Sequence, residues 1–219
     1  MEKTINIKFL GFGLALTLFF LSCSDVGNES ITNQTPASNG QAIHDFFISS
    51  PSFTEIRPRK RIPMQSSCYG ANLSPTLEWN GAPDDTKSLA LLVEDVDHET
   101  GVWVHWVLFN IPPTTTGISE GISTTTKILP DGTTQGVNDF KTLGWYGPCI
   151  PKKKIDYFGG PRHHTVPHSY YFRLYALDSK IEISPSATKV DLLEAIEGRI
   201  LSQAETVGKF QVRQEFTPN

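Results

Sequence analysis

The fold is decided by residues 102–111, which read Val-Trp-Val-His-Trp-Val-Leu-Phe-Asn-Ile. β-Branched and aromatic residues dominate this run, as is typical of a strand. Its interior is apolar on both faces apart from His105, and a strand of that kind is covered on both sides. We therefore expect a central strand in a sheet that is packed above and below.

Similar short runs recur along the chain and are separated by Gly, Pro, Asn and Asp. They cover Leu89 to Val93, Tyr170 to Leu177 and Phe210 to Val212. Short apolar runs separated by turn-forming residues predict a mostly antiparallel, all-β domain. The segment Lys152 to Val166, with three lysines and a Gly-Gly-Pro sequence, is expected to form an exposed loop.

One helix is predicted near the carboxyl end, where apolar residues recur at helical spacing. Thr188 and Asp191 stand ahead of it in the spacing of a capping box. The apolar stripe expected to pack against the sheet consists of Val190, Leu193, Ile196, Ile200 and Leu201.

The amino terminus has the pattern of a signal peptide, residues 1–22. Lys3 and Lys8 precede an apolar run that is short for a membrane-spanning helix and ends at Ser22-Cys23. This ending resembles the lipobox of bacterial lipoproteins, which implies a lipid anchor on Cys23 and, because Ser24 follows, sorting to the outer membrane. The alternative is an ordinary signal peptide in which Cys23 carries no lipid.

Residues 23–44 are rich in Ser, Thr, Asn, Gln, Gly and Pro, and this composition predicts a flexible tether ahead of one domain, residues 45–219. The formal net charge is -4, so no general attraction to nucleic acid is expected. Export would place Cys68 and Cys149 in an oxidising compartment, where a disulfide is possible. The sequence leaves that pairing open.

Acidic residues crowd the end of the Leu89 to Val93 run, from Glu94 to Glu99. An EF-hand loop would need Gly and Glu where Thr100 and Trp106 stand, so calcium of that type is excluded. The histidine spacing does not fit a zinc-binding helix either. No metal or other cofactor is predicted.

Two histidines stand beside other polar groups in apolar surroundings. His105, between Trp103 and Trp106, is by itself explained as a core histidine with a hydrogen-bond partner. His168, however, opens another strand with Tyr170 on the same face two residues later. Two imidazoles, a phenol and a carboxylate could therefore line one pocket.

The motifs along the chain resemble, in content and order, those of the phosphatidylethanolamine-binding protein family, and are most similar to its bacterial, Raf-kinase-inhibitor-like branch. The matching segments are Asn72-Leu73-Ser74-Pro75, Asp95-Val96-Asp97, Trp103-Val104-His105-Trp106, Asn110-Ile111-Pro112, Gly136-Val137-Asn138-Asp139, Gly147-Pro148-Cys149, His168-Ser169-Tyr170 and Leu174-Tyr175-Ala176-Leu177-Asp178. The resemblance implies an antiparallel two-sheet β domain. It also implies a non-enzymatic protein with one small pocket for phosphate-like anions or phospholipid headgroups.

Carried over motif by motif, the resemblance predicts a pocket formed by Asp95, Asp97, His105, Gly147, Pro148, His168 and Tyr170. Asp95 could orient an imidazole, imidazole and phenol groups could donate to phosphate oxygens, and backbone N–H groups near Gly147 could complete the site. Few fixed positive charges are present, so we expect weak binding that strengthens as the pH falls through the histidine range.

The chain departs from the family pattern in two places. Val96 stands where the family has proline, which leaves the turn that aims Asp95 less constrained. The basic segment Lys152 to Pro167 is longer than in bacterial relatives; it could cover the pocket, or it could be a solvated surface loop. Its basic and imidazole side chains are Lys152, Lys153, Lys154, Arg162, His163 and His164.

Two other functions remain as alternatives. Gly117-Ile118-Ser119-Glu120-Gly121, with Asp139 and His168 further on, matches the residue order of a serine hydrolase, but its flanks do not read as the strand and helix of a nucleophile elbow. The other alternative is a protease inhibitor or other protein-interaction module with a vestigial pocket and an unknown partner.

Overall fold

A computed structural model describes residues 45–56, 58–150, 153–157, 160–164 and 166–212. The expected signal peptide, the lipidation residue Cys23 and the tether lie outside these residues. By its contacts the chain divides into two units, and the larger, Ala42–Asn219, contains every described residue. None of the helices in the described ranges is long and apolar enough to cross a membrane.

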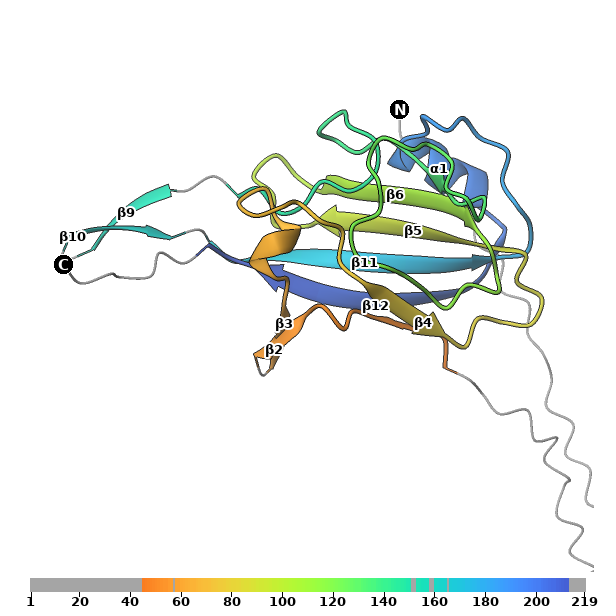
Figure 1. Ribbon diagram of the computed structural model, residues 1–219, viewed down its shortest axis with the longest axis horizontal. Coiled ribbons are helices and arrows are strands. Elements are labelled where there is room, and N and C mark those ends of the chain that lie inside the picture. Colours follow the sequence, from red (N-terminus) through yellow and green to blue (C-terminus); the bar gives the residue numbers. More distant parts are fainter. Residues whose placement is uncertain (1–44, 57, 151–152, 158–159, 165, 213–219) are drawn as a thin grey trace, which may run out of the picture. The chain divides into compact units, whose positions relative to one another are not determined.

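The main sheet has seven strands (Figure 1), all antiparallel to their neighbours except for the parallel pair β3 and β12. In spatial order they are β2 (Thr54–Ile56), β3 (Arg59–Arg61), β12 (Ile200–Phe210), β11 (His168–Leu177), β5 (Ser88–Asp95), β6 (Trp103–Ile111) and β8 (Thr134–Gln135).

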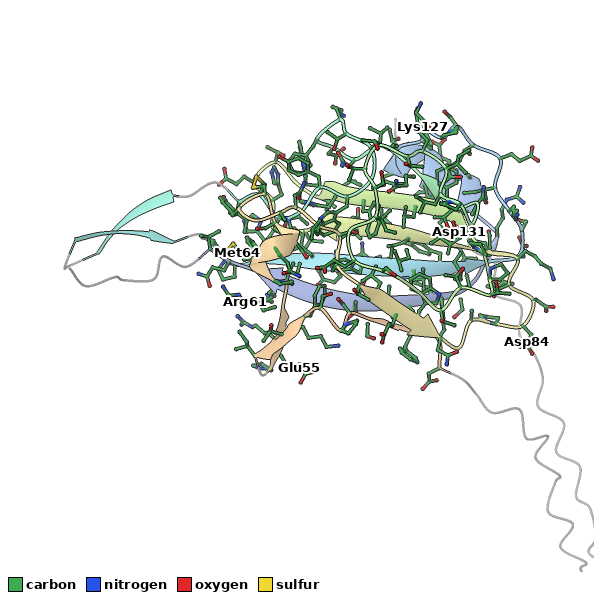
Figure 2. The ribbon with its side chains drawn as sticks, in the orientation of Figure 1. Glu55, Arg61, Met64, Asp84, Lys127 and Asp131 are labelled. Atoms are coloured by element: carbon green, nitrogen blue, oxygen red, sulfur yellow. A yellow bond between two sulfur atoms is a disulfide. The ribbon has the colours of Figure 1, made fainter. Side chains whose placement is uncertain are left out.

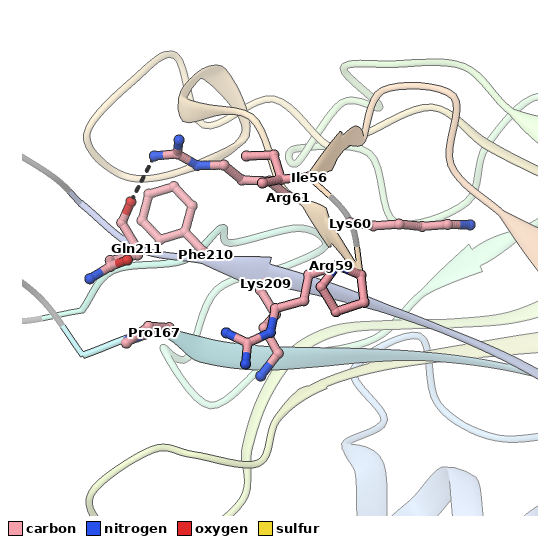
Figure 3. Close-up of a pocket in the computed structure, with 9 residues that line it drawn as sticks. Ile56, Arg59, Lys60, Arg61, Pro167, Lys209, Phe210 and Gln211 are labelled. Carbon is pink, nitrogen blue, oxygen red and sulfur yellow. Dashed lines mark hydrogen bonds between the residues drawn. The ribbon is translucent and has the colours of Figure 1, made fainter.

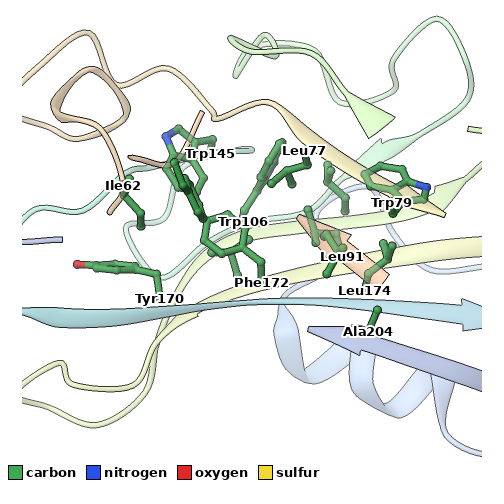
Figure 4. Close-up of a cluster of buried hydrophobic side chains, with 14 of the residues drawn as sticks. Ile62, Leu77, Trp79, Leu91, Trp106, Trp145, Tyr170, Phe172, Leu174 and Ala204 are labelled. Atoms are coloured by element: carbon green, nitrogen blue, oxygen red, sulfur yellow. The ribbon is translucent and has the colours of Figure 1, made fainter. Parts of the chain in front are cut away.

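A second, three-stranded sheet contains β1 (Phe47–Ser49), β4 (Leu77–Asn80) and β7 (Gly117–Ile118). A 3-10 turn, η1, spans Met64–Ser66. The larger core takes side chains from both sheets and is rich in aromatic rings (Figure 4). Its largest members are Trp79, Trp106, Trp145 and Tyr170. The antiparallel two-sheet β fold expected from the sequence is confirmed.

Helix α1 (Lys189–Ile196) packs on the opposite face of the main sheet, where Leu192 and Ile196 join a smaller core with Val107 of β6. Both faces of β6 are therefore covered, as its apolar sequence predicts. The capping box is also confirmed, because the Thr188 backbone N–H donates to Asp191 Oδ2 at 2.7 Å.

The expected helical stripe is wrong in part. The helix ends at Ile196, and Gly198 follows with φ of 73°, a left-handed conformation that stops a helix. Val190 is 62% exposed and Leu193 37% exposed, so neither packs on the sheet. Ile200 and Leu201 are exposed residues that open β12 instead.

The last strand is also longer than its apolar residues suggest. The sequence predicts a short strand from Phe210 to Val212, but β12 begins at Ile200 and ends at Phe210. Its inward positions include small residues such as Ala204 and Gly208, and most of its outward positions are polar. Because few large apolar side chains are needed there, the apolar pattern of the strand is weak.

The expected loop at Lys152 to Val166 is wrong as well. Its described backbone forms an antiparallel hairpin of β9 (Lys153–Tyr157) and β10 (Gly160–His164). Gly-rich dipeptides mark hairpin turns as well as loops, and the flanking Ile and Tyr favour strands. The side chains that were expected either to cover the pocket or to face solvent lie outside the described residues.

Candidate functional site

The register of the main sheet places three strand ends beside one another. Asp95, the last residue of β5, pairs with Tyr170 of β11 on one side and with Trp103 of β6 on the other. His168 lies two residues before Tyr170, so both side chains point to the same face. Residues far apart in the chain thus meet at one edge of the sheet.

A β-bulge in β6 brings His105 into this group. Val93 pairs with Trp106 and Glu94 with Val104, so His105 is the extra residue of the bulge. Bulges re-aim side chains next to functional sites. The His105 ring meets the Tyr170 ring edge-on, with 5.1 Å between the ring centroids.

Asp95 and His168 form a buried pair, with His168 Nδ1 lying 2.7 Å from Asp95 Oδ2. Burial acts to raise the pKa of Asp95, but the hydrogen bond and charge of His168 and the Asp97 backbone N–H together lower it. Asp95 is therefore ionised at neutral pH and acts as the acceptor, so the proton of this contact is on Nδ1. The other ring nitrogen, Nε2, is left for a ligand.

Asp97 has a supporting position in the turn after β5. Its Oδ2 accepts the Ser169 backbone N–H at 2.8 Å, while its own N–H donates to Asp95 Oδ1 at 2.9 Å. The carboxylate thereby ties the turn to the start of β11, next to His168. Val96 does not prevent this arrangement.

His105 is oriented by the backbone. Its Nδ1 lies 2.5 Å from the carbonyl oxygen of Tyr146, which can only accept, so Nδ1 carries the proton. Burial lowers the pKa of His105 to about 4, although the Tyr146 carbonyl opposes the shift. At neutral pH the ring is uncharged and offers only the Nε2 lone pair. In this form His105 can accept a hydrogen bond but has no free N–H for a phosphate oxygen.

Tyr170 is fully buried. Its hydroxyl makes no hydrogen bond of good geometry among the described residues, but it faces Asp95 closely enough to help lower the pKa of that carboxyl. Burial and the negative charge of Asp95 raise its pKa, so the phenol keeps its proton. An unpaired buried hydroxyl costs about 1–3 kcal/mol. Three other buried donors among the described residues also lack a hydrogen bond by the same criteria: Ser66 Oγ, Trp103 Nε1 and Trp145 Nε1.

The turn at Gly147 and Pro148 is held against the 3-10 turn. A Cβ on Gly147 would lie 1.8 Å from the Ser66 carbonyl oxygen, so this close approach needs glycine. The Gly147 N–H donates to Asn72 Oδ1 at 2.8 Å, so this N–H is taken; the expectation that other backbone N–H groups of the turn bind an anion stays a prediction. The reason is that Asn72, with φ of 55°, presents its amide to the turn.

The disulfide that the sequence left open joins these two segments. Cys68 and Cys149 are bonded, with 5.3 Å between their Cα atoms. The Cys68 N–H also donates to the Pro148 carbonyl oxygen at 3.1 Å, and Tyr69 donates its hydroxyl to the Ile150 carbonyl oxygen. The covalent bond and these hydrogen bonds fix the Gly147 turn next to the histidine cluster.

Partly exposed aromatic rings form a rim beside His105, and sequence reasoning missed two of them. Phe140 contacts His105 edge-on at 5.3 Å and stacks on Tyr146 at 4.0 Å, while Trp103 meets Phe140 at 5.6 Å. Phe140 follows the quoted Gly-Val-Asn-Asp motif directly and Tyr146 precedes Gly147. Adjacency to those motifs was the available signal.

The described residues around Ser119 do not have the local structure that a serine hydrolase needs at its nucleophile. Ser119 follows β7, a two-residue edge strand, and is exposed. Within the described ranges the next helix after Ser119 begins at Lys189. A nucleophile elbow requires a strand, a sharp turn and a helix in succession.

Comparisons with known proteins identify relatives of this chain. The sequence model of the phosphatidylethanolamine-binding protein family matches residues 52–211. A UPF0098 protein of Methanothermobacter thermautotrophicus is 45% identical over 153 residues, which cover 70% of this chain and 92% of the relative. LppC of Mycobacterium tuberculosis, named a putative lipoprotein, is 32% identical over 208 residues, covering 91% of this chain and 93% of LppC.

A solved structure shares the fold. The crystal structure of YbcL from E. coli, described as a member of the mammalian PEBP family, superposes with a TM-score of 0.64 at 28% identity. The match covers 77% of this chain and 99% of YbcL.

Proposed function

Because the chain belongs to the phosphatidylethanolamine-binding protein family, we propose that it is a non-enzymatic binding protein that holds a phosphate-type anion at Asp95, His105, His168 and Tyr170. The observation that carries the proposal is the buried Tyr170 hydroxyl, which faces the Asp95–His168 pair without a well-formed hydrogen bond. A buried donor that keeps its proton is a group that an anion would satisfy.

The ligand would take hydrogen bonds from two kinds of donor. Tyr170 offers a neutral O–H. His168 offers an N–H at Nε2 once its imidazole has taken up a second proton, because Nδ1–H is committed to Asp95. A charged donor forms the stronger bond to a phosphate oxygen. Anion binding would therefore be accompanied by proton uptake.

His105 would act differently at neutral pH. With Nδ1–H held by the Tyr146 carbonyl, its Nε2 can accept a hydrogen bond. A phosphate ester monoanion carries a hydroxyl that could supply it. Because His105 and His168 are 1% and 5% exposed, the ligand would enter after the aromatic rim of Trp103, Phe140 and Tyr146 shifts.

Calorimetry with inorganic phosphate and O-phosphorylethanolamine tests this function. Because anion binding would be accompanied by proton uptake, affinity should rise between about pH 7.5 and about pH 5.5. His168→Gln should abolish that dependence, whereas Lys87→Gln, before the far end of β5, should not. Absence of binding heat at both pH values would refute the proposal.

The location of the protein is a further part of this proposal. Lipidation of Cys23, export and attachment to the outer membrane are supported by the lipobox-like sequence and by the name of LppC. Labelled palmitate should enter the protein in cells and should not enter a Cys23→Ala variant.

A further inference from the structure

A groove with a volume of about 230 Å³ lies on the other side of β11 from Asp95, between the β2–β3 hairpin and the end of β12 (Figure 3). We call it the hairpin groove. Its apolar lining comes from Ile56, Pro167 and Phe210. Phe210 is the register partner of His168, so the groove lies one strand away from the histidine cluster.

Basic side chains surround the hairpin groove. Arg59, Lys60 and Arg61 come from β3, and Lys209 comes from β12 as the register partner of Arg61. Arg61 donates to the Gln211 carbonyl oxygen at 3.1 Å and Lys209 to Ser169 Oγ at 3.0 Å. These bonds hold the charges in place without neutralising them.

Few carboxylates lie near the basic side chains of the hairpin groove, so most of their positive charge is not neutralised. The ion pairs found among the described residues involve other side chains, around Glu94 and Asp95. One carboxylate, Glu55, faces Lys60 across the hairpin. The protein as a whole has a formal net charge of -4, so this concentration of cations is local.

The hairpin also exposes an apolar side chain among these cations. Ile56, at the end of β2, is 51% exposed and lies in the same groove as Arg59. Exposed aliphatic groups flanked by Arg and Lys match the boundary of a lipid bilayer, where the aliphatic part enters and the cations meet phosphates. The groove is also smaller than the roughly 300 Å³ at which small-molecule pockets begin. A headgroup presented at a surface fits it better than an enclosed ligand.

We propose that the hairpin groove docks the domain on an anionic phospholipid bilayer, through Arg59, Arg61, Lys209 and Ile56. Docking would hold the edge of the sheet that carries His168 at the membrane surface. The proposal does not depend on anion binding at Asp95 and His168, because the two sites use different side chains.

Vesicle sedimentation tests the proposal with the chain that begins at Ser24, which lacks the lipidation residue but keeps the whole compact unit Ala42–Asn219. Vesicles of phosphatidylcholine alone are compared with vesicles that contain one third phosphatidylglycerol. The protein should bind the anionic vesicles and should not bind the neutral ones. Its binding to the anionic vesicles should weaken as the salt concentration is raised.

Variants assign the binding surface. Arg59→Gln/Arg61→Gln/Lys209→Gln should lower the vesicle partition coefficient about 100-fold, on the basis of about 1 kcal/mol per cation. Lys87→Gln/Lys127→Gln/Lys180→Gln makes the same change in net charge elsewhere and should leave binding within a few-fold of the parent. Lys127 lies far from Arg61 and Glu55 (Figure 2). Circular dichroism checks that all variants are folded.

Three results would overturn the proposal. The groove variant could bind anionic vesicles as well as the parent does, or the control variant could lose as much binding as the groove variant. The parent could also bind polyglutamate through these side chains while ignoring vesicles, which would assign the groove to an acidic protein partner. Phosphate calorimetry on the groove variant keeps the two sites apart, because its binding heat should be unchanged.

Discussion

His105 is at once a satisfied core histidine and a member of the candidate site. Its bond to Tyr146 satisfies one nitrogen, and its ring lies against Tyr170. The sequence supports both interpretations, since it shows a histidine between two tryptophans. It cannot show that a bulge turns the ring toward Tyr170, because a bulge depends on the register with β5.

Acid should weaken the fold through His105. Its pKa of about 4 is below the ordinary value near 6.5, so below pH 6.5 the unfolded chain binds more protons than the native one. Stability is therefore lost as the pH falls from about 6.5 to about 4, by roughly 3 kcal/mol in full. Urea unfolding gives the free energy of unfolding of the parent and of His105→Gln. The difference between these two free energies should change by that amount between about pH 6.5 and about pH 4.

The lowered pKa of Asp95 affects the stability of the fold in a different pH range. The stability it contributes is complete above the unfolded value near pH 3.9 and is lost as the pH falls through the lower folded value. It does not overlap the His105 window. If the parent and His105→Gln lose stability in parallel between pH 6.5 and 4, the account of His105 is wrong.

Tyr170→Phe should separate stability from binding. Removing an unpaired buried hydroxyl relieves its desolvation, so the variant should be about 1 kcal/mol more stable in urea unfolding. The same change removes a donor to the anion and should weaken phosphate binding roughly tenfold in calorimetry. A less stable variant with unchanged affinity would contradict the assigned role.

At the level of elements, strong apolar patterns were the predictable part. β5, β6 and β11 follow from their runs of large apolar residues, and the capping box follows from Thr188 and Asp191. β12 did not, because its inward positions need small residues beside the second sheet. The helix was extended too far because Ile200 and Leu201 happen to continue its spacing.

The disulfide is the element-scale feature with the largest predicted effect on stability. It links residues 81 apart, and closing a loop of that length in the unfolded chain stabilises the native state by about 4 kcal/mol. Cys68→Ser/Cys149→Ser should lose that amount in urea unfolding. It should also weaken phosphate binding, because the Gly147 turn is no longer tied to the 3-10 turn.

Ser88→Ala serves as the comparison for this variant. It removes a buried hydroxyl hydrogen bond at the opposite end of β5, so it should cost about 1 kcal/mol without affecting anion binding. A disulfide-free variant as stable as the parent would show that the hydrogen bonds alone hold the two turns.

For the whole molecule, the order of short motifs was enough to assign the family, and the family match confirms it. The candidate site was predictable as a set of residues but not in its hydrogen bonding. Gly147 N–H is taken by Asn72, and His105 Nδ1–H by Tyr146. Each of these contacts joins segments more than forty positions apart or depends on a backbone carbonyl, so no local pattern records it.

A crystal structure with bound O-phosphorylethanolamine would show where the protein holds a phosphate group. We expect a phosphoryl group within hydrogen-bonding distance of His168 Nε2 and the Tyr170 hydroxyl, with Asp95 still bonded to His168 Nδ1. Ligand density elsewhere at saturation, with no contact to the Tyr170 hydroxyl, would rule out this site.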